Sequence, residues 1–316
     1  MTKIINECGK GKDFQQLAME AAFNVSGARY YVSGDTGSDA KDGKSWSKAK
    51  KTIQAAVDRC GNGTNDVIFV SPLTGDVRYN ENVLIKGHDG LKIIGVGCMK
   101  DTVIRASDAT TKLPFTPVGE AAVLGCCMAI MSADVEVRNL CFDASGNYVG
   151  LYVGDGYRID ETYAEEAGNG IVANCIFRYG TIGIVYDGAD QDLLAEGNYL
   201  YKQSVMGIHI GPGGTKQVQR ISVRGNTFFG CEDYGVYLYD TNETKNIMVD
   251  NNVFFDQTRG TIQMTNPIKF QGTGCHGASA NRLLTANGIS GAATDGVSGN
   301  YEAGNAANAA TYVTEA

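Results

Sequence analysis

Hydrophobic and polar positions follow a short pattern that recurs along the second half of the chain. Each copy has six residues, begins with Val or Ala, and in most cases ends with Phe or Leu. The copies lie at 137–142, 172–177, 195–200, 223–228 and 249–254, and two weaker copies follow at 278–283 and 297–302. They begin 19 to 35 residues apart. This irregular spacing indicates a solenoid whose coils carry loops of different length.

A second element follows each of the first five copies six to eight residues later. It is a Gly followed by apolar or β-branched residues, at 150–153, 183–186, 207–210, 235–239 and 260–264. We therefore expect each coil to contain two short strands joined by a tight turn, and then a longer, variable return. Period-two alternation inside the first element would place Val249, Asn251 and Val253 on one face, which indicates a strand and not a helix.

The fourth position of the six-residue pattern carries an amide side chain in five copies: Asn198, Asn226, Asn252, Asn281 and Asn300. Stacked coils place equivalent residues about 4.8 Å apart, and primary amides at that spacing can donate and accept hydrogen bonds along the stack. Asn and Gly also tolerate the left-handed backbone that a sharp bend between strands needs. Short strands without helices between them predict a parallel β-helix. The main competitor, a leucine-rich repeat, would show closely spaced Leu and a helix in each turn.

Composition agrees with one elongated, turn-rich β domain. The 316 residues include 41 Gly and 5 Pro, and a solenoid buries its core coil by coil. The formal net charge of −8 and the lack of a basic run argue against nucleic-acid binding. The sequence has no run of 18 apolar residues and no signal-peptide core at its start, so we expect neither membrane insertion nor export by the standard route.

Nine Cys are irregularly spaced and include no Cys-x-x-Cys pair. We expect them to be small buried residues of a protein that folds in a reducing cytosol. The three His residues, His88, His209 and His276, do not cluster with Cys as a zinc site requires. His209 lies between two Ile residues, which is typical of a strand wall. No metal and no cofactor is predicted.

The segment 30–46 leads an aromatic-Val strand into a Gly- and Asp-rich loop and then Trp46, and Lys-Thr-Ile-Gln-Ala-Ala-Val-Asp follows at 51–58. Apolar residues at helical spacing from Ile53 to Cys60 predict a short helix that covers the open end of the first coil. These thirty residues resemble the entry segment of the right-handed parallel β-helix proteins of the pectate-lyase-like superfamily, which has phage virion members of the decoration or tailspike type. The resemblance implies an all-β, right-handed parallel β-helix with a short N-terminal capping helix. It leaves the function open, because this superfamily includes polysaccharide lyases, glycosidases, phage tailspikes and non-catalytic virion proteins.

The chain is expected to have three parts. Strands at 67–70, 83–85 and 91–94 would begin the first coils, and residues 13–23 could form an amphipathic helix. The predicted parts are an N-terminal arm or cap at 1–29, the β-helix at 30–284, and a small-residue segment at 285–316 that forms thin coils or contacts another subunit. The acidic insert at 157–168 could be a contact loop for a partner or an ordinary surface loop.

Acidic side chains provide the candidate chemistry. Asp155, Asp187 and Asp240 each follow a Gly-led strand and could align on one edge, with Asp190, Asp192, Glu196, Glu232 and Asp233 nearby. Glycosidases with this fold use two or three carboxylates, but Asp is also common in turns for backbone reasons. Asp35, Asp39 and Asp42 could converge on Ca²⁺, although a turn without metal is the simpler interpretation. The motifs of polygalacturonases and pectate lyases are absent, so no catalytic residue is assigned.

Three functions remain as hypotheses. The first is a non-catalytic structural protein of a tailed-phage virion, assembled in the host cytoplasm. It would decorate or cement the capsid as a homotrimer that contacts virion proteins such as the major capsid protein. The second is a tailspike-type polysaccharide lyase or glycoside hydrolase, and the third is a glycan-binding adhesin. The second requires a groove lined by acids and by tyrosines that stack on sugar rings, for which the candidates are Tyr186, Tyr199, Tyr201, Tyr234, Tyr237 and Tyr239.

Overall fold

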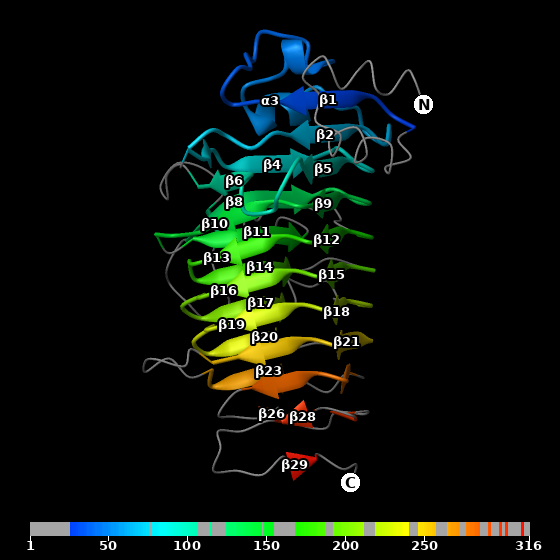
Figure 1. The fold of residues 1–316 in the computed structure, drawn as a ribbon. Coiled ribbons are helices and arrows are strands. Elements are labelled where there is room, and N and C mark those ends of the chain that lie inside the picture. The colour runs from blue at the N-terminus through cyan, green and yellow to red at the C-terminus, as the bar shows by residue number, and fades with distance from the viewer. Residues whose placement is uncertain are drawn as a thin grey trace, which may run out of the picture.

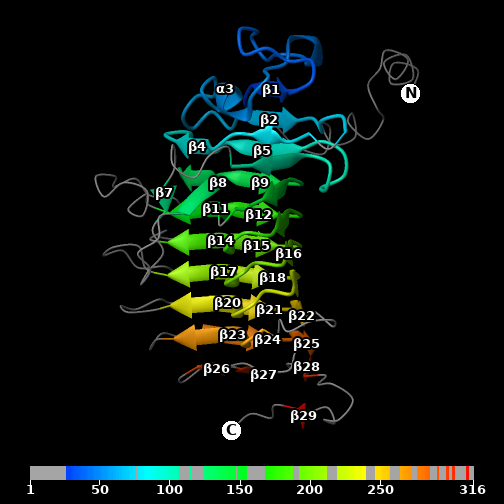
Figure 2. The same cartoon turned by 90° about the vertical axis from the view of Figure 1, so that its left-hand side faces the viewer.

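A computed structural model describes the chain from residue 26 to residue 312 with gaps. The described residues are 26–75, 77–106, 114–115, 124–146, 148–154, 168–187, 192–211, 219–239, 246–256, 264–271, 276–284, 290–291, 297–298, 301–302 and 311–312. Short strands stack into a column of coils, with β1 at one end and the C-terminal strands at the other (Figure 1). The view turned by 90° shows the same regular stacking from a second side (Figure 2).

Each complete coil contributes one strand to each of three sheets, in the order A, B and C. Sheet A contains β1 (Arg29–Val32), β2 (Val67–Val70), β5 (Lys92–Gly95), β9 (Glu136–Arg138), β12 (Ile171–Ala173), β15 (Leu194–Glu196), β18 (Ser222–Arg224), β21 (Ile247–Asp250), β24 (His276–Ser279) and β27 (Val297–Ser298). Sheet B contains β3 (Tyr79–Asn80), β6 (Val103–Arg105), β10 (Cys141–Asp143), β13 (Ile176–Arg178), β16 (Tyr199–Tyr201), β19 (Thr227–Phe229), β22 (Val253–Phe255), β25 (Arg282–Leu284), β28 (Tyr301–Glu302) and β29 (Thr311–Tyr312). Sheet C contains β4 (Val83–Lys86), β8 (Leu124–Met131), β11 (Val149–Gly154), β14 (Ile182–Asp187), β17 (Met206–Gly211), β20 (Tyr234–Tyr239), β23 (Asn266–Gln271) and β26 (Ser290–Gly291).

Pairing within the three sheets is parallel, apart from the last pair of sheet B, β28 with β29. A further short strand, β7 (Pro114–Phe115), lies antiparallel to β8 at the edge of the coil stack. The predicted parallel β-helix is therefore confirmed, and the strands predicted at 67–70, 83–85 and 91–94 correspond to β2, β4 and β5. None of the described helices combines the length and the apolar character that crossing a membrane requires.

The six-residue pattern forms two strands and not the single strand predicted. Asn251 has a φ angle of 55°, which is left-handed, and it bends the chain between β21 in sheet A and β22 in sheet B. Val249 and Phe254 are consequently both fully buried, although simple alternation would place them on opposite faces. Equivalent left-handed residues occur in the other coils at Asn139, Asn174, Gly197, Gly225 and Ala280. A coil thus has three strands where two were expected.

The Gly that opens the second predicted element lies where sheet C comes closest to a core side chain. A Cβ atom at Gly207 would lie 2.6 Å from Cδ1 of Phe228 and 2.7 Å from the carbonyl oxygen of Gly235. Only Gly leaves room for this close approach. In the fifth copy, predicted at 260–264, the sheet C strand is instead β23, and Pro267 lies at the position equivalent to Gly235.

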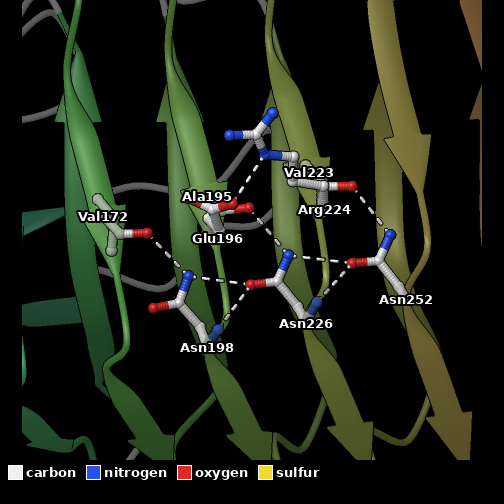
Figure 3. A network of polar contacts seen from close by, with 8 residues as sticks. All are labelled: Val172, Ala195, Glu196, Asn198, Val223, Arg224, Asn226 and Asn252. Carbon is white, nitrogen blue, oxygen red and sulfur yellow. Dashed lines mark hydrogen bonds and ion pairs between the residues drawn. The ribbon is translucent and has the colours of Figure 1, made fainter.

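The predicted amide ladder is confirmed at the bend between sheets A and B (Figure 3). The Nδ2 atoms of Asn198, Asn226 and Asn252 each donate to the Oδ1 atom of the next Asn at 3.0 Å, and Asn281 receives the last of these bonds. All four side chains are buried, and Asn300 lies outside the described residues. Parallel ring stacking in the core, 4.6 Å between the Phe228 and Phe254 centroids, reinforces the same repeat.

A short helix covers the N-terminal end of the coil stack, as predicted. In α3 (Ile53–Val57), Ile53, Ala56 and Val57 are fully buried and the helix contacts β1, β2 and β4. The Glu81 carboxylate accepts hydrogen bonds from the backbone N–H groups of residues 53 and 54 at 2.9 and 3.0 Å. It thereby satisfies donors that the first turn of a helix leaves open. The helix predicted at 13–23 and the insert at 157–168 lie outside the described residues, except for Gly168.

Candidate functional site

The three aspartates of the entry loop bind different backbone groups. Asp35 accepts a hydrogen bond of 2.9 Å from the loop after β2, and Asp39 accepts two, of 2.8 and 2.9 Å, from residues 51 and 52. Asp42 accepts one of 2.9 Å from the N–H group two residues later, which lowers the pKa of its carboxyl group. The Asp39 bonds attach the loop to the residues just before α3, the Asp35 bond attaches it to the loop after β2, and the Asp42 bond is local, as expected of turn aspartates. The described residues include no group of three or more His, Cys, Asp and Glu side chains that could hold a metal ion.

The acidic row predicted along one edge is divided between two walls of the solenoid. On the sheet A side, Asp192 contacts Arg220 at 2.7 and 3.1 Å, and Glu196 contacts Arg224 at 3.0 Å. The bond to Arg220 lowers the pKa of Asp192. Each pair joins successive coils, and all four side chains are at least 40% exposed, so solvent screens both pairs and each contributes little to stability.

The other acids of the predicted row lie toward sheet C. Glu232 and Asp233 immediately precede β20. Burial raises the pKa of Asp233. Asp190 lies outside the described residues. The predicted convergence of these acids is therefore wrong for the described residues, because the turns that carry them belong to different walls.

Of the three aspartates predicted to align, the structure describes Asp187, which is the last residue of β14. Strand register pairs it with Gly154 in the preceding coil and with Gly211 in the following coil. Asp155 and Asp240 lie outside the described residues, so the alignment of all three carboxylates stays a prediction.

Asp187 lies in a row with Tyr152 and His209. A Cβ atom on Gly154 would lie 2.5 Å from the Tyr152 hydroxyl, and one on Gly211 would lie 2.6 Å from Nε2 of His209. The phenol and the imidazole thus extend over the two glycines that flank Asp187 in the register. Tyr152, Asp187 and His209 are 0%, 1% and 6% exposed. The missing side chains of the glycines provide the space for this polar row.

A strip of phenol and ammonium groups continues along sheet C from His209. The His209 ring lies 5.8 Å from that of Tyr237, which stacks on Tyr234 at 4.7 Å. Lys269 Nζ lies 3.3 Å from the Tyr234 hydroxyl and 5.2 Å from the Tyr237 ring centroid. Burial is the largest of the effects that raise the pKa of Tyr237 to about 12, so this hydroxyl keeps its proton at neutral pH.

We call this row the sheet C strip; it consists of Tyr152, Asp187, His209, Tyr234, Tyr237 and Lys269. An imidazole and a carboxylate are groups that can accept or donate a proton in catalysis. Tyrosine rings combine an apolar face with a polar hydroxyl, and Lys269 adds a positive charge over two rings. Tyr234, Tyr237 and Lys269 are only partly buried, so this end of the strip can contact a polar ligand that has flat faces.

The six tyrosines proposed to line one sugar-binding groove fall in three places. Tyr186 is fully buried inside the coil stack. Tyr199 and Tyr201 lie on the outside of sheet B, where the Tyr201 ring stacks on Phe229 at 5.6 Å. The other three, Tyr234, Tyr237 and Tyr239, lie in β20 of sheet C. The prediction of a single groove is wrong, because the three-sided coil directs these rings to different sides.

Tyr152 and Lys269 are site residues that the sequence did not single out. A usable signal existed for Tyr152, since residues two positions after the leading Gly align as Tyr152, Val185, His209 and Tyr237. Lys269 follows Pro267 at the same interval, but without a leading Gly the repeat is not visible in the sequence.

The described cysteines are free thiols, and six of the seven are buried as predicted: Cys60, Cys126, Cys127, Cys141, Cys175 and Cys231. Burial raises the pKa of Cys175 to about 12. Such thiols are unreactive near neutral pH. Cys98 is exposed, and Cys8 and Cys275 lie outside the described residues.

Comparison with known proteins supports the fold assignment. Residues 161–276, less than half of the chain, match the family described as "Right handed beta helix region". No curated protein sequence matches the chain. Similar solved structures include pectate lyase Pel9A, with 14% identity, a TM-score of 0.53, and coverage of 85% of this chain and 69% of the lyase.

Two further structures are more distant. The GH136 lacto-N-biosidase from Eubacterium ramulus has 12% identity, a TM-score of 0.45, and coverage of 85% of this chain and 57% of the enzyme. ORF18 of Geobacillus virus E2 has 10% identity, a TM-score of 0.37, and coverage of 92% of this chain and 63% of the viral protein. The chain thus spans between 57% and 69% of the length of these three proteins. The family match and the three parallel sheets together identify the fold as a right-handed parallel β-helix.

Proposed function

We propose that this protein is a non-catalytic structural component of a tailed-phage virion, a β-helix that decorates or cements the capsid as a homotrimer. The observation that carries the proposal is the use of its acidic side chains. Asp192 and Glu196 bind arginines of the next coil, and Asp39 binds the backbone at the start of α3. These carboxylates hold coils and loops together, which is the role expected of acids in a structural rod.

Two further features support a structural role. The Asn ladder and the stacked Phe rings connect successive coils inside the rod. Because each coil contacts its neighbours, such ladders stiffen a solenoid along its length. The buried free thiols agree with assembly in a reducing cytoplasm, where virion proteins accumulate before the host cell lyses.

Immunogold electron microscopy and quantitative mass spectrometry of purified particles test this proposal. The particles should come from the phage or prophage that carries the gene. We expect regular labelling of the capsid and a copy number that is a multiple of three. Absence of the chain from particles that contain the major capsid protein would overturn the proposal.

The sheet C strip favours a second candidate function, binding or cleavage of a glycan. Asp187 pairs in the register with Gly211, two residues after His209. The rings of Tyr237 and Tyr234 continue the row from His209. A glycan-active protein should release reducing ends or unsaturated products from a bacterial polysaccharide, or should bind one without turnover. Asp187→Asn and His209→Gln should abolish turnover if the strip is catalytic, whereas Arg224→Met on sheet A should leave it unchanged.

A further inference from the structure

A cavity of about 520 Å³ lies near the N-terminal end of the rod, on the sheet B side. The loop after β2, the loop before β6 and the end of β13 form its walls. These residues are distinct from the sheet C strip. The volume falls within the range of about 300–1,000 Å³ that is typical of pockets for small organic ligands.

Two arginines on the wall of this cavity share a single carboxylate. Asp143 Oδ2 lies 3.1 Å from Nη1 of Arg78 and 3.1 Å from Nη2 of Arg178, and the Asp143 side chain is 2% exposed. Burial alone would raise the pKa of Asp143. Hydrogen bonds from Ser145 and the two guanidinium groups outweigh that effect and lower it, so Asp143 is ionised at neutral pH. Among the described residues of this cluster, two guanidinium charges face one carboxylate charge, which leaves an excess of one positive charge.

The two guanidinium groups also keep unused hydrogen-bond donors. Each guanidinium has five N–H groups, and Asp143 is the acidic partner of both among the described residues. Nε of Arg178 is buried and has no hydrogen-bond partner in the described part of the chain. The Arg78 and Arg178 side chains are 31% and 27% exposed. An oxyanion in the cavity would accept hydrogen bonds from exposed guanidinium N–H groups that Asp143 does not occupy, and pairs of this kind are short and strong.

The rest of the cavity is suited to the body of an organic molecule. Leu73, Val77 and Val103 contribute apolar lining, and Val77 is 54% exposed. Lys100 lines the cavity as well and pairs with the neighbouring Asp101 at 2.7 Å. A bare inorganic ion would fill only a small part of this volume and would leave the apolar lining uncovered.

We propose that this pocket binds a small organic anion. Its carboxylate or phosphate group would accept hydrogen bonds from Arg78 and Arg178, and its ring or hydrocarbon body would cover Leu73, Val77 and Val103. The excess positive charge and the guanidinium N–H donors favour an anionic group, and the apolar wall beside them favours an organic body. Occupancy of this pocket does not depend on the function proposed above.

Calorimetric titration of the full chain with matched probes tests the proposal. Benzoate presents a carboxylate on a phenyl ring, and phenyl phosphate presents a phosphate on the same ring. Benzamide is the neutral counterpart of benzoate. Acetate and inorganic phosphate carry the anionic groups without the ring. We expect benzoate or phenyl phosphate to bind at least about tenfold more tightly than benzamide, a difference of about 1.4 kcal/mol. The tighter of the two anions identifies the preferred group. Each should also bind more tightly than the ion without a ring.

Variants then locate the binding. Arg78→Met and Arg178→Met should each weaken the preferred probe at least about tenfold, while each leaves Asp143 with one arginine partner and so preserves the fold. Val77→Ser should weaken the ring probes only. Arg224→Met, which removes an arginine from the outside of sheet A, is the matched control and should bind as the wild type does.

Three outcomes would overturn the proposal. The first is that neither benzoate nor phenyl phosphate binds more tightly than benzamide, and the second is unchanged affinity in the Arg78→Met and Arg178→Met variants. The third is the failure of every anionic probe to bind at millimolar concentration. Melting curves of each variant, recorded alongside the titrations, separate a loss of binding from a loss of folding.

Discussion

Replacement of Asn226 by Ala should destabilise the middle of the rod far more than the change in side-chain size suggests. The Asn226 side chain makes four hydrogen bonds: it accepts from the backbone N–H and from Nδ2 of Asn198, and it donates to the Ala195 carbonyl and to Oδ1 of Asn252. These atoms lie between fully buried side chains (Figure 3). Water therefore cannot replace the lost partners.

The magnitude follows from these four bonds. A net contribution of about 1 kcal/mol for each gives a loss of about 4 kcal/mol in the free energy of unfolding, and stranded buried donors raise this figure. Asn226→Asp should cost at least as much, because a carboxylate cannot donate to Ala195 or Asn252 and carries a charge into a buried site. Leu140 and Cys175 occupy the equivalent position in the two coils that precede the ladder, before Asn198. The position therefore requires Asn only inside the ladder.

Urea unfolding followed by circular dichroism measures this loss. Arg224→Ala is the control, because Arg224 lies two residues away and also bonds to the preceding coil, but through an exposed ion pair with Glu196 that contributes about 0–1 kcal/mol. If Asn226→Ala and Arg224→Ala lower the unfolding free energy equally, the ladder is not the stabilising element described here. Hydrogen exchange of the amides of β18 and β19 would localise the effect, because a solenoid can open coil by coil.

Three further predictions concern other parts of the rod. Asp143→Asn should lower the melting temperature at pH 7. The pKa of Asp143 is lower in the folded state than in the unfolded state. Its contribution to stability is therefore present above the unfolded pKa of about 3.9 and is lost as the pH falls through the folded pKa. The melting temperature of the variant should consequently decrease less than that of the wild type over this acid range. Gly207→Ala should lower the free energy of unfolding by about 1–3 kcal/mol, as overpacking does, because the new Cβ atom would lie 2.6 Å from Phe228. A melting temperature equal to that of the wild type would contradict this reasoning. Cys175→Asn should change the free energy of unfolding by less than about 1.5 kcal/mol. The backbone N–H of Cys175 already donates to Asn198 at 2.9 Å, so the new amide side chain should extend the ladder. A loss as large as that of Asn226→Ala would contradict this extension.

The sequence was sufficient to predict the solenoid, because short strands with period-two alternation and an Asn at a fixed position of each repeat are typical of stacked coils. It was not sufficient to divide the coil correctly. The bend at Asn251 places Val249 and Phe254 in the same core, and a six-residue pattern of alternating residues resembles one strand until a left-handed residue within it is identified. The β23 strand was misplaced because Pro267 stands where the other coils have Gly.

The candidate site was less predictable than the fold. Acids could be listed from the sequence, but which wall each faces depends on the register of strands in different coils. The register pairs Asp187 with Gly154 and with Gly211, and such pairings cannot be read from a single sequence. The cavity beside Asp143 was missed for a similar reason, since Arg78 and Arg178 are 100 residues apart in the sequence and meet only through sheet B.

Light scattering of the purified chain, run alongside a reducing-end and unsaturated-product assay on a panel of bacterial polysaccharides, tests the central claim most directly. The structural proposal predicts the mass of a trimer, three times 33.6 kDa, with no turnover of any polysaccharide. Turnover that is abolished by Asp187→Asn and retained by Arg224→Met would contradict that proposal and would make the sheet C strip an active site.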